Sequence, residues 1–306
     1  NNELLKQRLS CIPIHITDVN FPLEDYIIEV HKINETDSID FVTTEDFKIK
    51  NIKTDTYLNS ADTKKIFPPS SLTGDYIDFA RLRPRLSEDI PGEELKFNCS
   101  LDIGSAEEDG AFNVASTCTY AATPDQVKIN ATWSAKAREL KSEGLSAEEI
   151  EFERKNWLLL EAKRITLPDS FDFTVESVGV FSNMNIIFKA VHIIMDKLDV
   201  VGQLIESEEH LIKTSDNTIP NSFDITLVKE DYTIGKILEY MLFATHYGKI
   251  LTFCGFLKKH PHDEDSIIRI AFKEPADNSE VIALIVGAVS RAKSIYQKIA
   301  TMFQDV

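Results

Sequence analysis

Residues 223–238 read FDITLVKEDYTIGKIL, and this stretch indicates how the C-terminal part of the chain folds. In its first half, apolar side chains alternate with polar ones, which predicts a half-buried strand over Phe223–Leu227. We expect a helix to begin near Thr233 and to end before Gly248, where a left-handed conformation costs glycine little. Its apolar residues recur at the spacing of one helix face: Ile234, Ile237, Leu238, Met241 and Leu242.

The residues that follow predict a hairpin and a long terminal helix. Two alternating segments, 249–257 and 266–272, are predicted strands on either side of a polar loop. Asp277 with Glu280 is a capping pattern that opens a predicted helix over 278–304. Its apolar positions are spaced alternately by four and three residues: Val281, Ile285, Ala288, Ala292, Ile295, Ile299 and Met302.

A similar pair of elements lies upstream. Phe171–Gly179 alternates as a strand, and Ser182 can cap a helix over 183–206. Because both long helices carry a heptad stripe, we expect them to pack on each other or on a partner. Ordinary core packing and homo-oligomers fit the stripes as well. The stripe of the upstream helix is Ile187, Val191, Ile194, Leu198, Val201 and Ile205.

The rest of the chain separates into three kinds of segment. Residues 40–133 are rich in strand signals, of which Leu95–Ile103 is the clearest, and predict an all-β insert. Ser146 with Glu149 is a capping box that opens a charged helix over 147–164. The polar run 214–220 predicts a linker between two α+β units.

Composition limits the classes of function. Thirty-three basic and fifty acidic residues give a formal charge of −17, which argues against a generic grip on DNA or RNA. The four cysteines stand far apart without a C-x-x-C pattern, which predicts free thiols rather than a zinc site or disulfides. No apolar run has membrane-spanning length, so we expect an intracellular protein without membrane contact. The chain begins with Asn rather than Met, from which we expect its native start to be absent.

No catalytic constellation can be singled out. The chain has neither a dinucleotide-binding glycine loop nor a phosphate-binding P-loop. His260-Pro-His262-Asp-Glu-Asp265 gathers metal-ligating residue types in one loop, but a solvated turn explains it better, and we predict no metal or cofactor site. Glu107-Glu108-Asp109 is interpreted as a charged hairpin turn. Because active sites are often assembled from scattered residues, a free-standing enzyme with a lid domain stays open as a hypothesis.

The opening stretch contains a strand, then Lys229-Glu-Asp231, then Thr233-Ile-Gly235 at a helix start. This order resembles the smaller alpha-like subunit of multisubunit DNA-directed RNA polymerases, the archaeal L type and the eleventh subunit of polymerase II. The resemblance covers residues 221–306. We expect Gly235, in the first helical turn, to let another backbone approach closely. The later matching features are Gly255-Phe256, His260-Pro261, Arg269 and the long terminal helix.

Most of residues 1–206 is similar to the larger alpha-like partner, the archaeal D type and the third-largest subunit of polymerase II. The family's first strand and its Asn-Ala-Leu-Arg-Arg helix are missing, and so is the cysteine cluster that binds zinc or iron–sulfur in many relatives. Fusion of the two subunits resembles the arrangement in large nucleocytoplasmic DNA viruses. The matching segments are Glu3–Pro13, Val42–Asp46, Leu82-Arg83-Pro84 with Gly92–Leu95, Asp102–Tyr120 and Phe171–Gly179.

The resemblance implies an α+β fold in which two alpha-like dimerisation units form a pseudo-dimer, the first unit carrying a mostly β insert domain. In this interpretation the two terminal helices form a shared core. The implied domains are a larger alpha-like unit at 1–40 and 166–210, the insert at 41–165, a linker at 211–221 and the smaller alpha-like unit at 222–306.

The function that the resemblance implies is a non-catalytic assembly platform for transcription. The expected partners are the two large catalytic RNA polymerase subunits and small zinc-bearing polymerase subunits, with DNA and RNA contacted only through the complex. Mg²⁺ is expected in the catalytic subunits. A viral protein of this kind is expected in viral factories of the host cytoplasm and in the virion, and a cellular one in the nucleus. A viral structural scaffold with self-assembling helical seams is the alternative.

The residues expected at subunit interfaces follow from the same resemblance. Arg8 is expected in a salt bridge or as an exposed helix charge. Glu230 and Asp231 are expected to contact a partner or to cap their helix, and His260 and Pro261 to pack in a corner between subunits or to form a surface turn. The remaining candidates are Gly235 and the stripe residues Ile187, Ile194, Leu198, Ile285 and Ile295.

Overall fold

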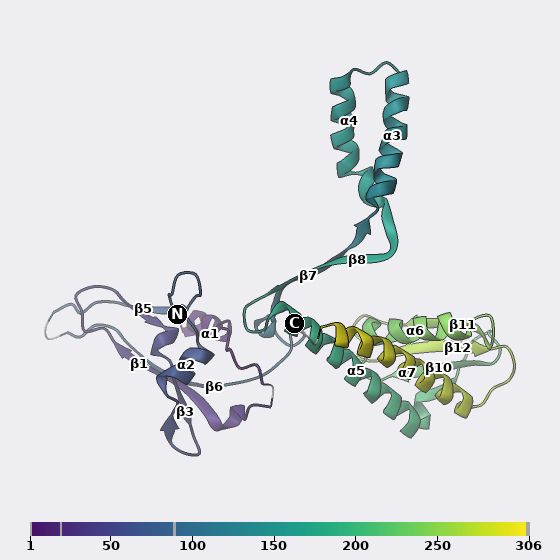
Figure 1. Ribbon diagram of the computed structural model, residues 1–306. Coiled ribbons are helices and arrows are strands. Elements are labelled where there is room, and N and C mark those ends of the chain that lie inside the picture. Colours follow the sequence, from purple (N-terminus) through teal and green to yellow (C-terminus); the bar gives the residue numbers. More distant parts are fainter. Residues whose placement is uncertain (1, 19, 88–89, 304–306) are drawn as a thin grey trace. The chain divides into compact units, whose positions relative to one another are not determined.

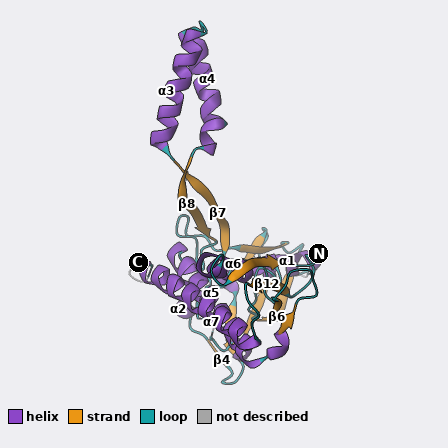
Figure 2. Ribbon diagram, turned by 90° about the vertical axis from the view of Figure 1, so that its right-hand side faces the viewer, coloured by secondary structure: helices purple, strands orange, loops and turns teal. Residues whose placement is uncertain are grey.

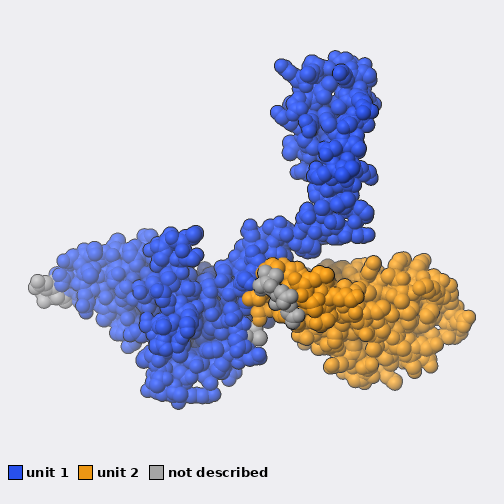
Figure 3. Space-filling model, in the orientation of Figure 1, with its two compact units in different colours: residues 1–183 blue, residues 184–306 orange. Residues whose placement is uncertain are grey.

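The computed structural model describes residues 2–18, 20–87 and 90–303. The protein is a mixed α+β structure with several separate sheets (Figure 1). It forms two compact units, Asn1–Asn183 and Met184–Val306, which are coloured separately in Figure 3.

The first unit contains an antiparallel sheet with the strand order β4-β3-β1-β6. Phe47 lies at the centre of its core, where the rings of Phe67, Phe79 and Phe97 meet it edge-on. Such edge-to-face contacts are a favoured arrangement of aromatic rings. The strands of this sheet are β1 (Tyr26–Ile33), β3 (Lys48–Asn51), β4 (Thr56–Tyr57) and β6 (Glu94–Ser100). The accompanying elements are α1 (Asn2–Ser10), η1 (Leu23–Asp25), η2 (Thr44–Asp46), α2 (Ser60–Ile66), β2 (Asp40–Thr43) and β5 (Asp78–Leu82).

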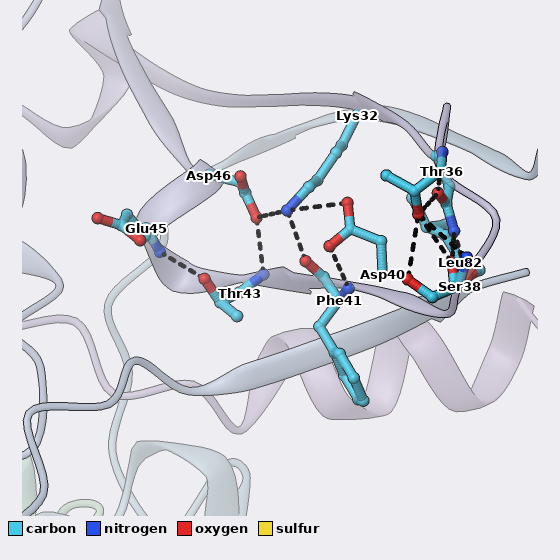
Figure 4. A network of polar contacts seen from close by, with 10 residues as sticks. Lys32, Thr36, Ser38, Asp40, Phe41, Thr43, Glu45, Asp46 and Leu82 are labelled. Atoms are coloured by element: carbon cyan, nitrogen blue, oxygen red, sulfur yellow. Dashed lines mark hydrogen bonds and ion pairs between the residues drawn. The ribbon is translucent and has the colours of Figure 1, made fainter. Parts of the chain in front are cut away.

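A polar network joins the end of β1 to the antiparallel β2–β5 pair (Figure 4). Asn34 is fully buried, and its amide nitrogen donates to the carbonyls of Ser38 and Leu82 at 2.8 and 3.0 Å. The Lys32 ammonium donates to the Phe41 carbonyl at 2.6 Å. Because a buried amide is costly unless it is hydrogen bonded, Asn34 fixes the loop that connects these strands.

A two-stranded antiparallel ribbon and a helical hairpin complete the first unit. Figures 1 and 2 show the two helices of the hairpin side by side at the end of the ribbon. Trp133 and Trp157 pack between the helices with ring centroids 5.5 Å apart, and Ile129 and Ala162 are buried beside them. The elements are η3 (Gly110–Phe112), β7 (Ala115–Pro124), α3 (Gln126–Ser142), α4 (Ala147–Leu159), η4 (Glu161–Arg164) and β8 (Thr166–Ser177).

The second unit is a four-stranded antiparallel sheet, in the order β11-β12-β10-β9, with its helices on one face. The register pairs Phe223 with Ile270 and Ile225 with Ile268, which places these apolar side chains on the helix-covered face. The elements are α5 (Asn183–Ser207), η5 (Glu209–Leu211), β9 (Ile212–Thr214), β10 (Ser222–Leu227), α6 (Tyr232–His246), β11 (Leu251–Leu257), β12 (Ser266–Phe272) and α7 (Asn278–Met302).

Helices α5 and α7 share the core of this second unit. Gly202 of α5 approaches Val289 of α7 so closely that a Cβ at Gly202 would lie 3.5 Å from a Val289 methyl group. A small residue therefore lies at the contact between the two helices, where the side chain of Val289 packs against it. The other buried side chains of this contact region are Leu198, Val201, Ile205, Ile285, Ala288 and Ala292.

The helical content of the middle segment differs from the sequence prediction. Residues 126–133 were expected within an all-β insert, but they form the first part of helix α3. Asp125 caps this helix, because its side chain accepts a hydrogen bond from the backbone nitrogen of Lys128. The charged helix predicted over 147–164 ends at Leu159. Leu160 leaves helical geometry with φ −113° and ψ −81°, and a 3₁₀ turn follows.

The domain boundaries also differ from the expected ones. Residues 1–40 and 166–210 were expected to form one alpha-like unit, but the chain divides between Asn183 and Met184. The described part of 1–40 shares its apolar core with the strands of the expected insert, whereas α5 packs in the second unit. The physical reason is that a helix or strand buries its apolar face against the elements that it contacts in the fold, even where these elements are distant in the sequence.

The linker predicted over residues 211–221 is not a linker in the structure, since part of it belongs to the second sheet. Leu211 and Ile212 are buried, and β9 pairs with β10 as an edge strand of the second sheet. The backbone nitrogen of Ser215 donates to the Ser222 carbonyl at 2.8 Å, which closes a hairpin. The polar residues that suggested a linker are the same types that a hairpin connection uses.

Candidate interaction surfaces

The helix stripes predicted as interface residues divide into buried and exposed positions. Leu198 and Ile285 are fully buried in the core of the second unit. Ile187 and Ile194 are half-buried, and Ile194 packs against that core. Ile295, in the C-terminal half of α7, remains 44% exposed. Most of the stripe therefore holds this unit together internally, and its C-terminal end is open.

Glu230 and Asp231 form the corner between β10 and α6. Glu230 is 8% exposed, and its carboxylate accepts from Lys197 of α5 at 3.2 Å. Its backbone carbonyl accepts from the Ser266 hydroxyl at 2.6 Å. Asp231 caps α6 by accepting from the backbone of Thr233 at 3.0 Å. Asp231 therefore caps α6 as one interpretation expected, whereas Glu230 is held by Lys197 and Ser266 and does not cap the helix.

Gly235 corrects one sequence expectation. The group that approaches it is the aromatic ring of Phe256, and not another backbone. A Cβ at Gly235 would lie 1.9 Å from a carbon of that ring. The rings of Tyr232 and Phe256 also meet, with centroids 5.2 Å apart. Gly235 is therefore required by the packing of α6 on β11.

Arg8 is exposed on α1 and makes a hydrogen bond instead of a salt bridge. Its guanidinium donates to the backbone carbonyl of Asp78 at 2.7 Å, which ties α1 to β5. It lines an open groove of about 800 Å³ together with Phe41, Arg81 and Glu93. Arg8 therefore fits the exposed helix charge, and its salt bridge to another subunit stays a prediction.

His260 and Pro261 lie in the exposed loop between β11 and β12. The backbone nitrogen of His260 donates to Asp263 at 3.1 Å, and the nitrogen of His262 donates to His260 Nδ1 at 3.1 Å. These local bonds make the segment a surface turn. In residues 2–18, 20–87 and 90–303, no group of three or more His, Cys, Asp or Glu side chains is placed to hold a metal ion.

An aromatic stripe on the outer face of α6 is a surface that sequence reasoning missed. Tyr240 is 64% exposed, and the rings of Phe243 and Tyr247 stack with centroids 4.5 Å apart. Tyr232, at the start of the helix, and Tyr247, directly after its end, are 56% and 49% exposed. Their spacing was visible in the sequence, but it was masked by the stronger apolar pattern of the buried side. Aromatic side chains are enriched in protein interfaces, and outward-facing stripes of them mark binding surfaces.

A second apolar surface lies on the β7–β8 ribbon. The register pairs Tyr120 with Phe173 and places Phe171 beside them, so the three rings gather on one face. All three are exposed. The opposite face is polar, with Thr117 paired to Glu176. A two-stranded ribbon with one apolar face is marginally stable by itself, and therefore this face also suits a partner.

The second sheet carries an ion pair on its helix-free face. The Arg269 guanidinium donates to both carboxylate oxygens of Asp224, at 2.6 and 2.7 Å. This bidentate contact lowers the pKa of Asp224, and a hydrogen bond from Ser215 acts in the same direction. Burial raises the pKa of Cys254 to about 12, so its thiol stays protonated and is not an activated nucleophile.

The arrangement is suited to binding other proteins. Its distinctive features are exposed aromatic rings on α6 and on the ribbon. None of the helices in the described part of the chain combines the length and the hydropathy needed to span a bilayer. No protein-family model matches the sequence, and no curated protein matches it in a sequence search.

Proposed function

We propose that this chain is a non-catalytic assembly subunit of a multisubunit DNA-directed RNA polymerase, in which two alpha-like modules pair and hold the two large catalytic subunits. The observation that supports it best is the aromatic stripe of α6, an exposed surface on the helix whose start matches the polymerase motif. Binding energy at protein interfaces is concentrated in such aromatic residues.

The packing of α5 on α7 supports the pseudo-dimer within this proposal. In that interpretation, α5 is the last helix of the larger module and α7 the last helix of the smaller one, and their contact is the pairing of the two. Fusion makes this pairing intramolecular, at an effective concentration on the order of millimolar for a short connection. In this interpretation the N-terminal part of the larger module and its insert domain belong to the first unit, and its last helix α5 belongs to the second.

The chemistry of transcription is assigned to the partners. Mg²⁺ is held by the catalytic subunits, and small zinc-bearing subunits complete the platform. Because the chain carries a charge of −17, DNA and RNA are contacted only through the complex. A viral protein of this kind works in viral factories of the host cytoplasm and enters the virion, and a cellular one works in the nucleus.

Co-purification tests the proposal. An affinity-tagged chain is recovered from the cells in which it functions, and its partners are identified by mass spectrometry. We expect two very large subunits and template-dependent RNA synthesis in the eluate. The double substitution Tyr240→Ala with Phe243→Ala should release the large subunits, whereas Leu72→Ala, an exposed apolar residue of a loop, should not. Recovery of the chain without large subunits contradicts the proposal.

One observation favours the scaffold alternative. The C-terminal end of the α7 stripe is open, with Ile295 at 44% and Met302 at 74% exposure. An open helical stripe can pair with another copy. Light scattering on the purified chain separates the two functions. The scaffold is favoured if the chain forms a discrete symmetric oligomer and the double substitution Ile295→Asp with Met302→Asp makes it monomeric. A monomeric wild-type chain favours the polymerase subunit.

A further inference from the structure

The helical hairpin carries an apolar stripe that faces away from its own core. Within the hairpin, α4 packs on α3 through Trp157, which is buried. Phe152 precedes Trp157 by five residues, which places it about 140° away around a helix of 3.6 residues per turn. Phe152 is 69% exposed and Leu159, seven residues later, is 64% exposed. Helix α4 therefore has two apolar sides, of which α3 covers one.

The spacing of the outer stripe is that of a helix–helix contact. Phe152 and Leu159 lie on α4 at an interval of seven residues, and the half-buried Leu145 directly precedes the Ser146 cap of that helix. Side chains at this interval recur on one side of a helix and meet the heptad positions of a second helix. A helix exposed to water on that side would normally carry charged residues there.

The charge around the stripe indicates what kind of helix fits it. Leu145 and Phe152 line a surface hollow of about 370 Å³ with Glu148, Glu149 and Glu153. Hydrogen bonds from the Ser146 backbone and hydroxyl hold Glu149 in its ionised form by lowering its pKa. Lys155 follows Phe152 by three residues and is the basic residue of that side. The rim is therefore acidic around an apolar floor.

We propose that the outer side of α4, formed by Phe152 and Leu159 together with Leu145 just before the helix cap, is a docking site for a basic amphipathic helix of another protein. Leucine-like side chains of the partner at heptad spacing cover the stripe, and its Lys or Arg residues meet the acidic rim. A second copy of this chain is the poorer occupant, because it would place Glu148, Glu149 and Glu153 against themselves. This inference does not depend on the polymerase proposal.

The experiment uses the whole 306-residue chain and two synthetic peptide helices. Both carry leucine at heptad spacing, but one is flanked by lysine and the other by glutamate. Fluorescence anisotropy of the labelled peptides measures binding. We expect the lysine peptide to bind, and to weaken as ionic strength rises. Phe152→Ala with Leu159→Ala should weaken it about tenfold or more. Val127→Ala, which truncates an 82% exposed residue of α3, should leave it unchanged.

The variants are expected to fold, because each replaced side chain is mostly exposed. The emission of Trp133 and Trp157, the two tryptophans of the chain, verifies that the hairpin is intact. Equal binding of the two peptides, or no binding of either, overturns the proposal. The proposal is also overturned if the double variant binds the lysine peptide as tightly as the wild type does. The same holds if the wild-type chain is a dimer and the double variant is a monomer.

Discussion

Asp199 of α5 and Lys293 of α7 form an ion pair across the contact of the two longest helices, with Nζ 2.6 Å from Oδ2. The two residues are 94 positions apart in the sequence. Their side chains are 44% and 35% exposed, so water screens the pair in part. Along each helix, the pair is about one turn away from the contact of Gly202 with Val289.

Removal of this ion pair should cost little stability by itself. We expect Lys293→Ala and Asp199→Ala each to lower the free energy of unfolding by about 0.5–1 kcal/mol, as for partly exposed pairs. The double variant should lose less than the sum of the two. Urea denaturation of all four proteins measures the coupling. Strict additivity would show that the two charges do not interact in solution.

Gly235→Ala should destabilise the second unit by about 1–3 kcal/mol, because the new methyl group overlaps the Phe256 ring. Phe256→Leu, which shortens the opposing side chain, should restore part of the loss. Gly202→Ala is the matched control in another helix, since its Cβ meets Val289 at an ordinary contact distance of 3.5 Å. That control should be neutral or gain up to about 1 kcal/mol from helix propensity. Equal losses in both glycine variants would contradict this account.

The Asp224–Arg269 pair predicts a specific dependence of stability on pH. The pKa of Asp224 lies below its ordinary value of 3.8 in the folded protein, chiefly because Arg269 donates to it. The stabilisation is therefore complete above pH 3.8 and is lost as pH falls through the lower folded-state pKa.

Asp224→Asn should remove this component. The difference in melting temperature between the wild type and Asp224→Asn is expected to shrink as the pH falls below 3.8. Asp216→Asn, at an exposed carboxylate of the β9–β10 connection, should keep the wild-type profile. A difference that stays constant with pH would mean that the asparagine acts through packing alone.

The hairpin should unfold before the second unit. Its core contains few buried side chains, namely Ile129, Trp157 and Ala162, whereas the core of the second unit is continuous. Both tryptophans of the chain lie in the hairpin, so tryptophan emission reports on it alone. We expect the emission transition at a lower urea concentration than the main loss of helical ellipticity.

A core variant of the second unit controls this measurement. Leu238→Ala truncates a fully buried side chain. It should lower the free energy of unfolding of the second unit, measured from the ellipticity transition, by about 2–5 kcal/mol. The tryptophan transition should not move. Coincident transitions in the wild type, or a joint shift in the variant, would show that hairpin and second unit unfold together.

Local signals in the sequence determined most elements of the second unit. The capping pair Asp277–Glu280 forms, and α5, α6 and α7 begin within a residue of their predicted starts. In the first unit, the predicted capping pair Ser146–Glu149 forms as well. These features depend on side chains three or four positions apart, which are read directly from the sequence. Helix α3 was missed because its apolar residues are too few to set a period.

The tertiary structure decided which parts of the chain share a core. Polar residues at 214–220 suit a linker and a hairpin equally well, and the burial of Ile212 made them a hairpin. The residues near Gly235 in the sequence do not predict its contact with Phe256, whose ring occupies the space that a Cβ at Gly235 would need. The sequence by itself therefore determined helices α5, α6 and α7 and strands β10, β11 and β12 with their buried sides, because short-range periodicity and capping set them. The partner of each buried side was settled only in three dimensions, because it depends on residues far apart along the chain.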